Sequence, residues 1–387
     1  MKMRSPIRVL HVVPSLAKDA GVTSVVYNLT RFSDSTRVRY DFLHHDMLDG
    51  NPRHENNLDG KFESWGCRVY RVNYASADFL RFIREVHDVM GNVGGTYDVV
   101  HCHMPNSAFC VLREAKKAGV SVRVLHSHLN TSSDRLSHRI RNAPLIAIGR
   151  HFANDYIACS KEAGGYLFRN KPFTLLHNGI DLSKFAYDQV VRDSLRMELG
   201  IPSDSRTVGC VGRLSKQKNL SFALRVFGKI SKAEPSFRMI IVGDGEEEED
   251  LKRLAVELQI DKKVMFTGIR DDVERFYSLF DCLLMPSLYE GLPVTAVEAQ
   301  AAGLPCLYSS RVPAETDITN SGRFLSLDGS LDEWADGLKT ALLAPRVVSA
   351  PERLAIAGYS AERNAELLMR HYESLTNGRD KNISERQ

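Results

Sequence analysis

The sequence lacks cysteine motifs, long apolar runs and a large excess of charge. Its 7 Cys are scattered along 387 residues without a CxxC pair, which argues against a disulfide framework and against a structural zinc site. No run approaches the roughly 18 apolar residues of a spanning helix, so we expect any membrane contact to be peripheral. Lys and Arg total 51 against 48 Asp and Glu, and this net charge of +3 is too small to predict a nucleic-acid partner.

The length and the rest of the composition favour an ordinary globular protein. At roughly 150 residues per domain, 387 residues predict about two domains, and 43% hydrophobic residues can form a large core. Residues 1–6 are basic, but the apolar run after them has only the length of a strand, and no small-residue cleavage site follows it. These features predict a reducing, cytoplasmic location.

Short apolar runs alternate with amphipathic helical patterns through the chain. Nearly continuous apolar strands of this kind are typical of parallel sheets that helices cover on both faces. The pattern restarts near residue 205, after a polar connection that contains proline. We therefore predict an α/β protein with two doubly wound, Rossmann-like domains, residues 1–182 and 183–358, that face each other across a cleft. The predicted strands include residues 7–13, 99–103, 122–126, 156–158, 207–211, 239–242, 264–267, 282–285 and 306–308.

Two glutamates lie where one strand turns into a helix. Residues 285–305 predict a strand end, a turn rich in Gly and Pro, and a helix that begins near Pro293, whose missing N–H suits the first helical position. Glu290 lies in the turn and Glu298 lies on the helix, so both can point toward a ligand whose phosphate meets the helix N-terminus. Glu298 could accept hydrogen bonds from a ribose diol. The spacing alone equally allows two surface carboxylates.

A basic loop follows the predicted strand at 207–211. Gly212 would let a ligand approach the backbone closely, while Arg213 and Lys218 offer a planar bidentate donor and a point charge. These are the groups that a diphosphate site needs. A basic surface loop is the alternative reading, and the presence of the glutamate turn in the same half favours the diphosphate site.

Glycines mark two more strand-to-helix turns. Gly243 and Gly245 follow the strand at 239–242, and Gly21 lies in a further loop of the N-terminal half that could approach phosphate. Turns of this kind often need glycine for structural reasons alone.

Four histidines lie near the ends of two predicted strands. His101 and His103 share one face of their strand, as do His126 and His128, because side chains two residues apart point to the same side. Four imidazoles could form a metal site, but no recognised ligand spacing accompanies them. Hydrogen bonding to a substrate or structural packing is favoured over a metal.

Residues 135–151 combine basic and apolar side chains at near-helical spacing. Such a segment can lie on an anionic membrane or hold a lipid-linked phosphate. The alternative is a solvated basic face beside the core, because Pro144 should interrupt the pattern. The side chains concerned are Arg135, His138, Arg139, Arg141, Arg150 and His151, with Leu136, Ile140, Leu145, Ile146 and Ile148.

Taken in order along the chain, these motifs resemble the retaining glycosyltransferases of family 4, which have the GT-B fold. The resemblance covers most of the chain and is most specific at Glu290 and Glu298, with seven residues between them. The segment His126-Ser-His128 resembles enzymes of capsular or exopolysaccharide assembly. The remaining motifs are Gly21 with its helix, Tyr97-Asp-Val-Val-His-Cys-His103, His177-Asn-Gly-Ile-Asp181, Gly212-Arg213 with Lys218, and Val242-Gly-Asp-Gly245.

The resemblance implies a role for each matching residue. Arg213 and Lys218 would hold the donor diphosphate, Glu298 would bind the nucleotide ribose, and Glu290 would lie near the donor sugar. His128, or His126 if the register slips, would lie by the sugar and the acceptor. The backbone at Ile269 and Arg270 would meet the base. The donor site would also include Gly21, Gly212, Gly243, Gly245, Gly291 and Leu292.

The implied reaction transfers a sugar from a nucleotide diphosphate sugar, with UDP favoured, to an acceptor hydroxyl with retention at the anomeric carbon. The acceptor would be a saccharide, in particular a lipid-linked one of surface-polysaccharide assembly at the inner face of the cell membrane. Arg213, Lys218 and helix N-termini would replace a metal ion, so no cofactor is expected. A helix at 361–375, within a last segment 359–387, would cross back to the first domain.

Other functions are compatible with the same residues. A nucleotide-sugar epimerase or a sugar phosphorylase of this fold would turn over the donor without an acceptor alcohol. A noncatalytic nucleotide-sugar-binding protein and a metal hydrolase built on the histidines are the remaining alternatives.

Overall fold

The structure is a computed structural model that describes residues 5–18, 20–48, 51–52, 56–128 and 136–384. The chain forms two compact units, of which unit 1 comprises Met1–Gly179 with Ala361–Gln387 and unit 2 comprises Ile180–Ser360. The chain therefore passes from one unit to the other at residues 179 and 360, rather than at the expected 182 and 358.

Unit 1 contains a doubly wound sheet. Its seven parallel strands lie in the order β4-β2-β1-β5-β6-β7-β8, and the short β3 pairs antiparallel with the end of β2. The strands are β1 (Ile7–Val13), β2 (Val38–Leu48), β3 (Asn51–Pro52), β4 (Val69–Asn73), β5 (Val99–Cys102), β6 (Val122–Ser127), β7 (Asp155–Ala158) and β8 (Thr174–Leu175). The helices are α1 (Gly21–Arg31), α2 (Asp59–Ser64), α3 (Phe79–Val93), α4 (Ala108–Lys117), α5 (Leu136–Phe152), α6 (Lys161–Phe168) and α14 (Ala361–Ser384), with a 3-10 turn at Gly94–Thr96.

Unit 2 repeats the architecture with six parallel strands in the order β11-β10-β9-β12-β13-β14. The strands are β9 (Thr207–Val211), β10 (Arg238–Val242), β11 (Val264–Phe266), β12 (Cys282–Met285), β13 (Cys306–Ser309) and β14 (Gly322–Leu325). The helices are α7 (Gln189–Glu198), α8 (Leu220–Ala233), α9 (Glu248–Glu257), α10 (Val273–Leu279), α11 (Val294–Ala301), α12 (Leu331–Leu343) and α13 (Ala350–Ile356), with 3-10 turns at Lys216–Lys218, Asp261–Lys263 and Ala314–Thr316. The predicted α/β class and the two Rossmann-like domains are thus confirmed.

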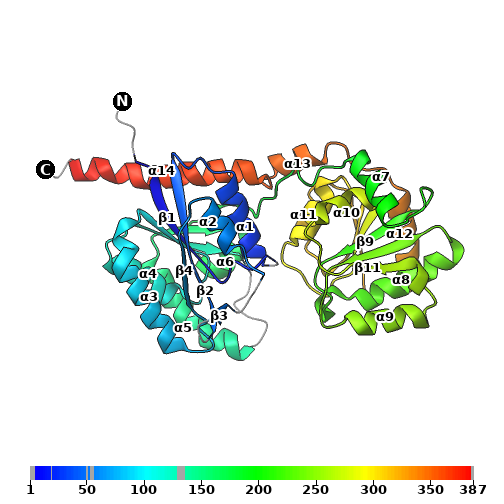
Figure 1. The fold of residues 1–387 in the computed structure, drawn as a ribbon, viewed down its shortest axis with the longest axis horizontal. Coiled ribbons are helices and arrows are strands. Elements are labelled where there is room, and N and C mark those ends of the chain that lie inside the picture. The colour runs from blue at the N-terminus through cyan, green and yellow to red at the C-terminus, as the bar shows by residue number, and fades with distance from the viewer. Residues whose placement is uncertain (1–4, 19, 49–50, 53–55, 129–135, 385–387) are drawn as a thin grey trace. The chain divides into compact units, whose positions relative to one another are not determined.

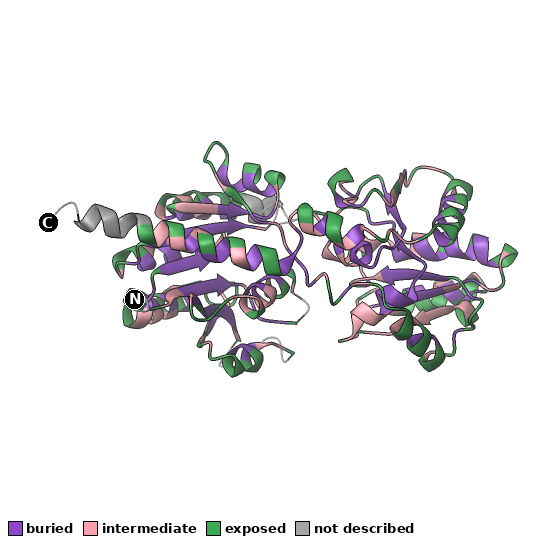
Figure 2. Ribbon diagram, turned by 90° about the horizontal axis from the view of Figure 1, so that it is seen from above, coloured by how far each residue is buried: buried purple, intermediate pink, exposed green. Residues whose placement is uncertain are grey.

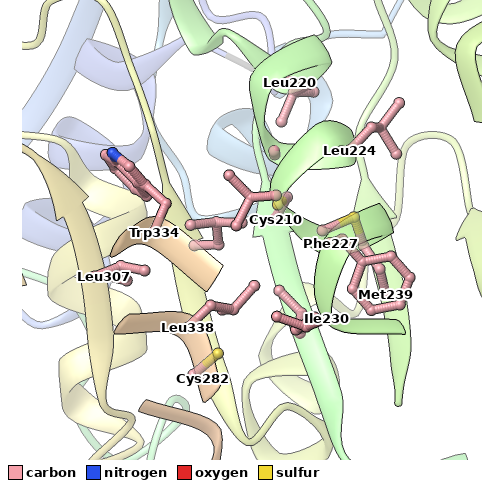
Figure 3. Close-up of a cluster of buried hydrophobic side chains, with 14 of the residues drawn as sticks. Cys210, Leu220, Leu224, Phe227, Ile230, Met239, Cys282, Leu307, Trp334 and Leu338 are labelled. Carbon is pink, nitrogen blue, oxygen red and sulfur yellow. The ribbon is translucent and has the colours of Figure 1, made fainter. Parts of the chain in front are cut away.

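Each sheet is covered by helices on both faces (Figure 1). Its central strands are buried, while the helices alternate buried and exposed positions (Figure 2). In unit 2, one core cluster joins Cys210 of β9 to α8 and to Trp334 of α12 (Figure 3). Burying such side chains stabilises the fold by about 25 cal/mol per Å² of apolar surface removed from water. This free energy explains why the central strands are almost uniformly apolar.

The last helix belongs to unit 1. Helix α14 packs on α1, and Tyr372, Leu368 and Met369 join the core cluster that contains Val9 of β1. The guanidinium of Arg37 binds Glu373 through two hydrogen bonds of 2.8 and 2.9 Å and Glu366 through a third of 2.6 Å. The helix runs nine residues beyond the predicted end at Leu375.

Two local predictions were wrong, and one strand was not predicted. Helix α5 continues through Pro144 instead of being interrupted there. Helix α11 begins at Val294, and Pro293 is its extended N-cap residue rather than the first helical residue. The sequence did not suggest β2, because Asp41 and His44 interrupt its apolar pattern; Asp41 is satisfied in the core by the hydroxyl of Tyr97 at 2.7 Å.

Helices long and apolar enough to cross a bilayer are absent from the part of the chain that the structure describes.

Candidate active site

The sheet order of unit 2 brings two loops of the sequence analysis together. Strands β9 and β12 are neighbours in the centre, and the chain winds outward from them in opposite directions. Ligands of doubly wound sheets bind beyond the carboxyl ends of strands at this reversal. The loop after β9 (residues 212–219, the β9 loop) and the loop after β12 (residues 286–293, the β12 loop) both begin there.

Lys218 and Glu290 form the contact that joins the two loops. The Lys218 Nζ lies 2.7 Å from the Glu290 Oε1, and their side chains are only 19% and 6% exposed. Backbone bonds align the loops: the Leu288 N–H donates to the Gln217 carbonyl at 2.8 Å. The Gln217 side-chain amide donates to the Tyr289 carbonyl at 3.0 Å and to the Glu290 Oε2 at 3.3 Å. Residues that are 72 positions apart in the sequence thus form one polar cluster.

The glycines allow the strand ends to approach one another. Gly212 has φ +136°, and its missing side chain leaves room for the aliphatic part of Lys218. A Cβ on Gly243 would lie 2.1 Å from the Gly212 carbonyl oxygen, and one on Gly245 would lie 2.4 Å from the Leu214 carbonyl oxygen. The structure therefore gives Gly243 and Gly245 a packing role against the β9 loop.

Arg213 lies apart from the Lys218–Glu290 pair. Its side chain is 75% exposed and pairs with Glu246 at 3.2 Å. Ile269 is exposed, and the guanidinium of Arg270 binds both carboxylate oxygens of Asp272 at 2.8 and 2.9 Å. The side chain of Arg270 is thus engaged locally, which leaves its backbone as the part suited to a ligand.

Glu298 lies on α11 and receives a hydrogen bond from the buried Tyr277. The Tyr277 hydroxyl donates to the Glu298 Oε2 at 2.7 Å. Burial raises the pKa of Glu298 to about 7, although the hydrogen bond from Tyr277 and the charge of Lys184 act in the opposite direction. Gly291 is exposed and Leu292 half-buried between Glu290 and the helix. The second carboxylate of the motif is therefore held close to its titration point.

The histidines of unit 1 form a hydrogen-bonded cluster larger than the sequence predicted. His11 of β1 joins His101 and His103 at the end of β5 and His126 and His128 at the end of β6. His103 bridges His11 and His128, with 2.8 Å between the nitrogens on each side. His101 shares hydrogen bonds of 3.0 Å with His126 and 2.5 Å with the Tyr372 hydroxyl.

Burial keeps these imidazoles neutral. It lowers the pKa of His11 to about 3 and that of His128 to about 4, although the Asn178 side chain opposes the second shift. The pKa values of His101, His103 and His126 also lie well below the usual range because of burial. His128 is the partly exposed member, which makes it the one best placed to meet a ligand.

The remaining predicted residues lie in unit 1. Gly21 is the exposed first residue of α1. In helix α5, Ile146 is buried, whereas Ile140 and Ile148 are 68% and 45% exposed. Arg135 lies outside the described residues, as do the side chains of His138 and Arg139.

Several polar partners of the site could not be predicted from the sequence. Tyr277, Gln217 and Tyr372 had no assigned role. Asn178 lies in the motif His177-Asn-Gly-Ile-Asp181, but its contact with His128 depends on the fold. His11 did offer a signal, because it is a lone imidazole in a strand that is otherwise apolar from Val9 onward.

Two family models together match most of the chain. Residues 20–184 match the family model described as Glycosyltransferase Family 4, and residues 191–361 match Glycosyl transferases group 1. The chain is 31% identical to the putative glycosyltransferase EpsF of Bacillus subtilis over 95% of this chain and 97% of that protein. It is 29% identical to an Escherichia coli UDP-Gal:alpha-D-GlcNAc-diphosphoundecaprenol alpha-1,3-galactosyltransferase over 55% of this chain and 58% of that protein.

The fold is also that of solved glycosyltransferases. A crystal structure of Anabaena HepE in complex with UDP superposes with a TM-score of 0.69 at 17% identity, covering 98% of this chain and 100% of that one. A Rickettsia africae glycosyltransferase gives 0.76 at 14% identity, over 96% of this chain and 99% of that one. Two Rossmann-like units that match these structures place the chain in the GT-B fold class.

Within that class, the chain belongs to glycosyltransferase family 4. It is accordingly an enzyme that transfers a sugar from a nucleotide-sugar donor, as members of this family do. The resemblance seen in the sequence is confirmed.

Proposed function

We propose that the chain is a retaining glycosyltransferase that moves a sugar from a UDP-sugar to a lipid-linked saccharide in surface-polysaccharide assembly. The observation that carries the proposal is the contact between Lys218 and Glu290, since it unites the two loops at the centre of the unit 2 sheet. UDP is favoured because the E. coli relative is named for UDP-Gal and the Anabaena structure contains UDP. The polysaccharide role is supported by the resemblance of the segment His126-Ser-His128 to enzymes of capsular or exopolysaccharide assembly.

The donor would bind beyond β9 and β12. An ammonium group has three donors, and one of those of Lys218 is directed at Glu290, so others can meet diphosphate oxygens. Arg213 would leave the exposed Glu246 and add a bidentate contact, and such a surface ion pair costs little to break. Glu298 would accept hydrogen bonds from the ribose, and the backbone at Ile269 and Arg270 would meet the base.

Transfer would rest on positioning and on charge. Glu290, with the backbone of Gly291 and Leu292, would orient the sugar, while Lys218 and Arg213 would stabilise the negative charge of the leaving diphosphate. The leaving phosphate would take the proton of the acceptor hydroxyl on the same face of the sugar. This chemistry needs no metal ion at the diphosphate, because two cations and helix N-termini take its place.

The acceptor side would be provided by unit 1. His128, and His126 behind it, would lie by the sugar and acceptor, and Gly21 would let phosphate approach the start of α1. The exposed Ile140 and Ile148 of α5, with Arg141 and His151 on the same helix, suit contact with an anionic membrane surface that presents the lipid-linked acceptor.

The test is a thermal-shift titration with UDP, GDP, ADP and their sugar conjugates, with and without EDTA, followed by product analysis. A ligand at one hundred times its Kd adds about 2.7 kcal/mol, so the donor nucleotide should raise the melting temperature clearly. We expect stabilisation by UDP that EDTA does not alter, and an α-linked product with a lipid-diphosphate saccharide. Stabilisation by another nucleotide, or donor turnover without an acceptor, would refute the assignment.

A further inference from the structure

We infer a binding site for a divalent transition metal, Zn²⁺ in the first place, formed by His103, His126 and His128 of unit 1. One ring nitrogen from each of the three lies within 4.8 Å of the other two. Imidazole nitrogen is a ligand that Zn²⁺ accepts readily, and three protein ligands with an open fourth position are a common arrangement around it.

The first observation is an unsatisfied nitrogen. His126 is fully buried, and its Nε2 has no hydrogen-bond partner among the described residues. A buried polar atom without a partner costs about 1–3 kcal/mol, so its retention needs a reason. A metal ion bound to this lone pair supplies one, because the other nitrogen of the ring, Nδ1, already shares a hydrogen bond with His101.

The second observation is that, in each of the three rings, the nitrogen that would not bind the metal has a hydrogen-bond partner. With His126 binding through Nε2, the proposed ligand atoms are the His103 Nδ1 and the His128 Nε2. His103 then keeps its Nε2 contact with His11 at 2.8 Å, and His128 keeps its Nδ1 contact with the Asn178 Oδ1 at 3.3 Å. Metal-binding histidines nearly always use the second ring nitrogen in this way, which fixes the tautomer and the ring orientation.

The two ligand nitrogens that already touch require only a small adjustment. The His103 Nδ1 and the His128 Nε2 are 2.8 Å apart in the structure. Tetrahedral zinc with Zn–N bonds of about 2.0–2.1 Å separates two ligand nitrogens by about 3.3 Å. Widening this contact by about half an ångström replaces one N–H···N bond by two metal–ligand bonds.

A second triad in the cluster is the poorer candidate. One nitrogen each from His11, His101 and His103 also lie within 4.8 Å of one another. Both nitrogens of His101 are already bonded, to Tyr372 and to His126, and all three rings are at most 4% exposed. That triad offers no open coordination position, whereas the partly exposed His128 gives the chosen one access to solvent.

The inference that the ion binds does not rest on the proposed function. The expected effect of the bound ion on sugar transfer does rest on it. An ion here would occupy His128, the imidazole that the proposed function places by the sugar and acceptor. We therefore expect Zn²⁺ to slow transfer and EDTA to restore it, with donor binding in unit 2 unaffected.

The test uses the full chain, stripped with EDTA and desalted. Zn²⁺ is titrated in competition with a chromogenic chelator, and Co²⁺ is added separately to record the visible bands of tetrahedral coordination. We expect one ion per chain, a loss of affinity of at least tenfold in both His126→Gln and His128→Gln, and a loss of about 10–100-fold in Asn178→Ala, which removes only the partner of His128. The control is His87→Gln. The imidazole of His87 is 63% exposed and pairs with Glu114, away from the cluster.

The melting temperature in EDTA shows whether each variant is folded. If His126→Gln does not fold, the result for His128→Gln decides the test. Wild-type protein that binds no stoichiometric Zn²⁺, or His128→Gln that binds it unchanged, would overturn the inference. UDP titration of the same samples is independent: zinc binding without a UDP shift would leave the metal site standing and refute the proposed donor.

Discussion

Replacing Lys218 by Met tests both the stability and the chemistry of the candidate site. The substitution keeps the aliphatic part of the side chain beside Gly212 and removes the charge that faces Glu290. Breaking a buried ion pair on one side costs about 3–5 kcal/mol, because the remaining charge stays buried without its partner. Lys218 is 19% exposed, and the Gln217 amide still donates to Glu290, so we expect a smaller loss, about 2 kcal/mol.

This loss should be visible in calorimetry. For a unit the size of residues 180–360, 1 kcal/mol shifts the melting temperature by about 2–4 °C, so the transition of unit 2 should fall by about 4–8 °C. The double variant Lys218→Met/Glu290→Gln should recover most of it, because no isolated charge remains. Both should lose about 100-fold or more in kcat/KM, since the donor diphosphate loses a cation.

Arg213→Met is the matched control. Arg213 is 75% exposed and its ion pair is solvated, so its removal should change stability by less than about 0.5 kcal/mol. Its transfer rate should still fall sharply, because the proposed function uses its charge at the diphosphate. A Lys218→Met protein that melts with the wild type would refute the structural reasoning, and wild-type turnover in both variants would refute the proposed site.

Two further predictions concern Glu298 and Gly243 of unit 2, with Gly21 of unit 1 as a control. Burial raises the pKa of Glu298 to about 7, so donor affinity should fall by up to tenfold per pH unit below about pH 7, because the carboxylate that would accept hydrogen bonds from the ribose becomes protonated. Glu298→Gln should abolish this pH dependence, and Tyr277→Phe should move it to higher pH, because the hydrogen bond that lowers the pKa of Glu298 is lost. Binding titrations from pH 5 to 9 test both expectations. Gly243→Ala should destabilise unit 2 by more than about 2 kcal/mol and impair donor binding, because its Cβ would lie 2.1 Å from the Gly212 carbonyl oxygen. The control is Gly21→Ala, whose Cβ would meet no atom within 4 Å, so this variant should have the melting temperature of the wild type. Equal melting temperatures of the two variants would contradict the packing role of Gly243.

Much of the fold could be read from local patterns. Strands such as β9 and β12 are almost wholly apolar because helices cover both faces of the sheet, and that pattern is visible without coordinates. Strand β2 was missed because its polar residues, Asp41 among them, find buried partners that are remote in sequence. The course of α5 through Pro144 could not be predicted either, since tertiary packing of Ile146 and Gly149 outweighs the local cost of proline.

The sequence by itself determined which residue types are available for chemistry: two spaced glutamates, a basic loop after a glycine, and paired histidines. Only the tertiary structure decided how they combine. It places Lys218 against Glu290 but Arg213 on the surface, and it adds His11 to the other histidines. The physical reason is that local patterns record burial and backbone geometry, whereas an ion pair or a shared imidazole proton depends on distances set by strand order and by the packing of distant segments.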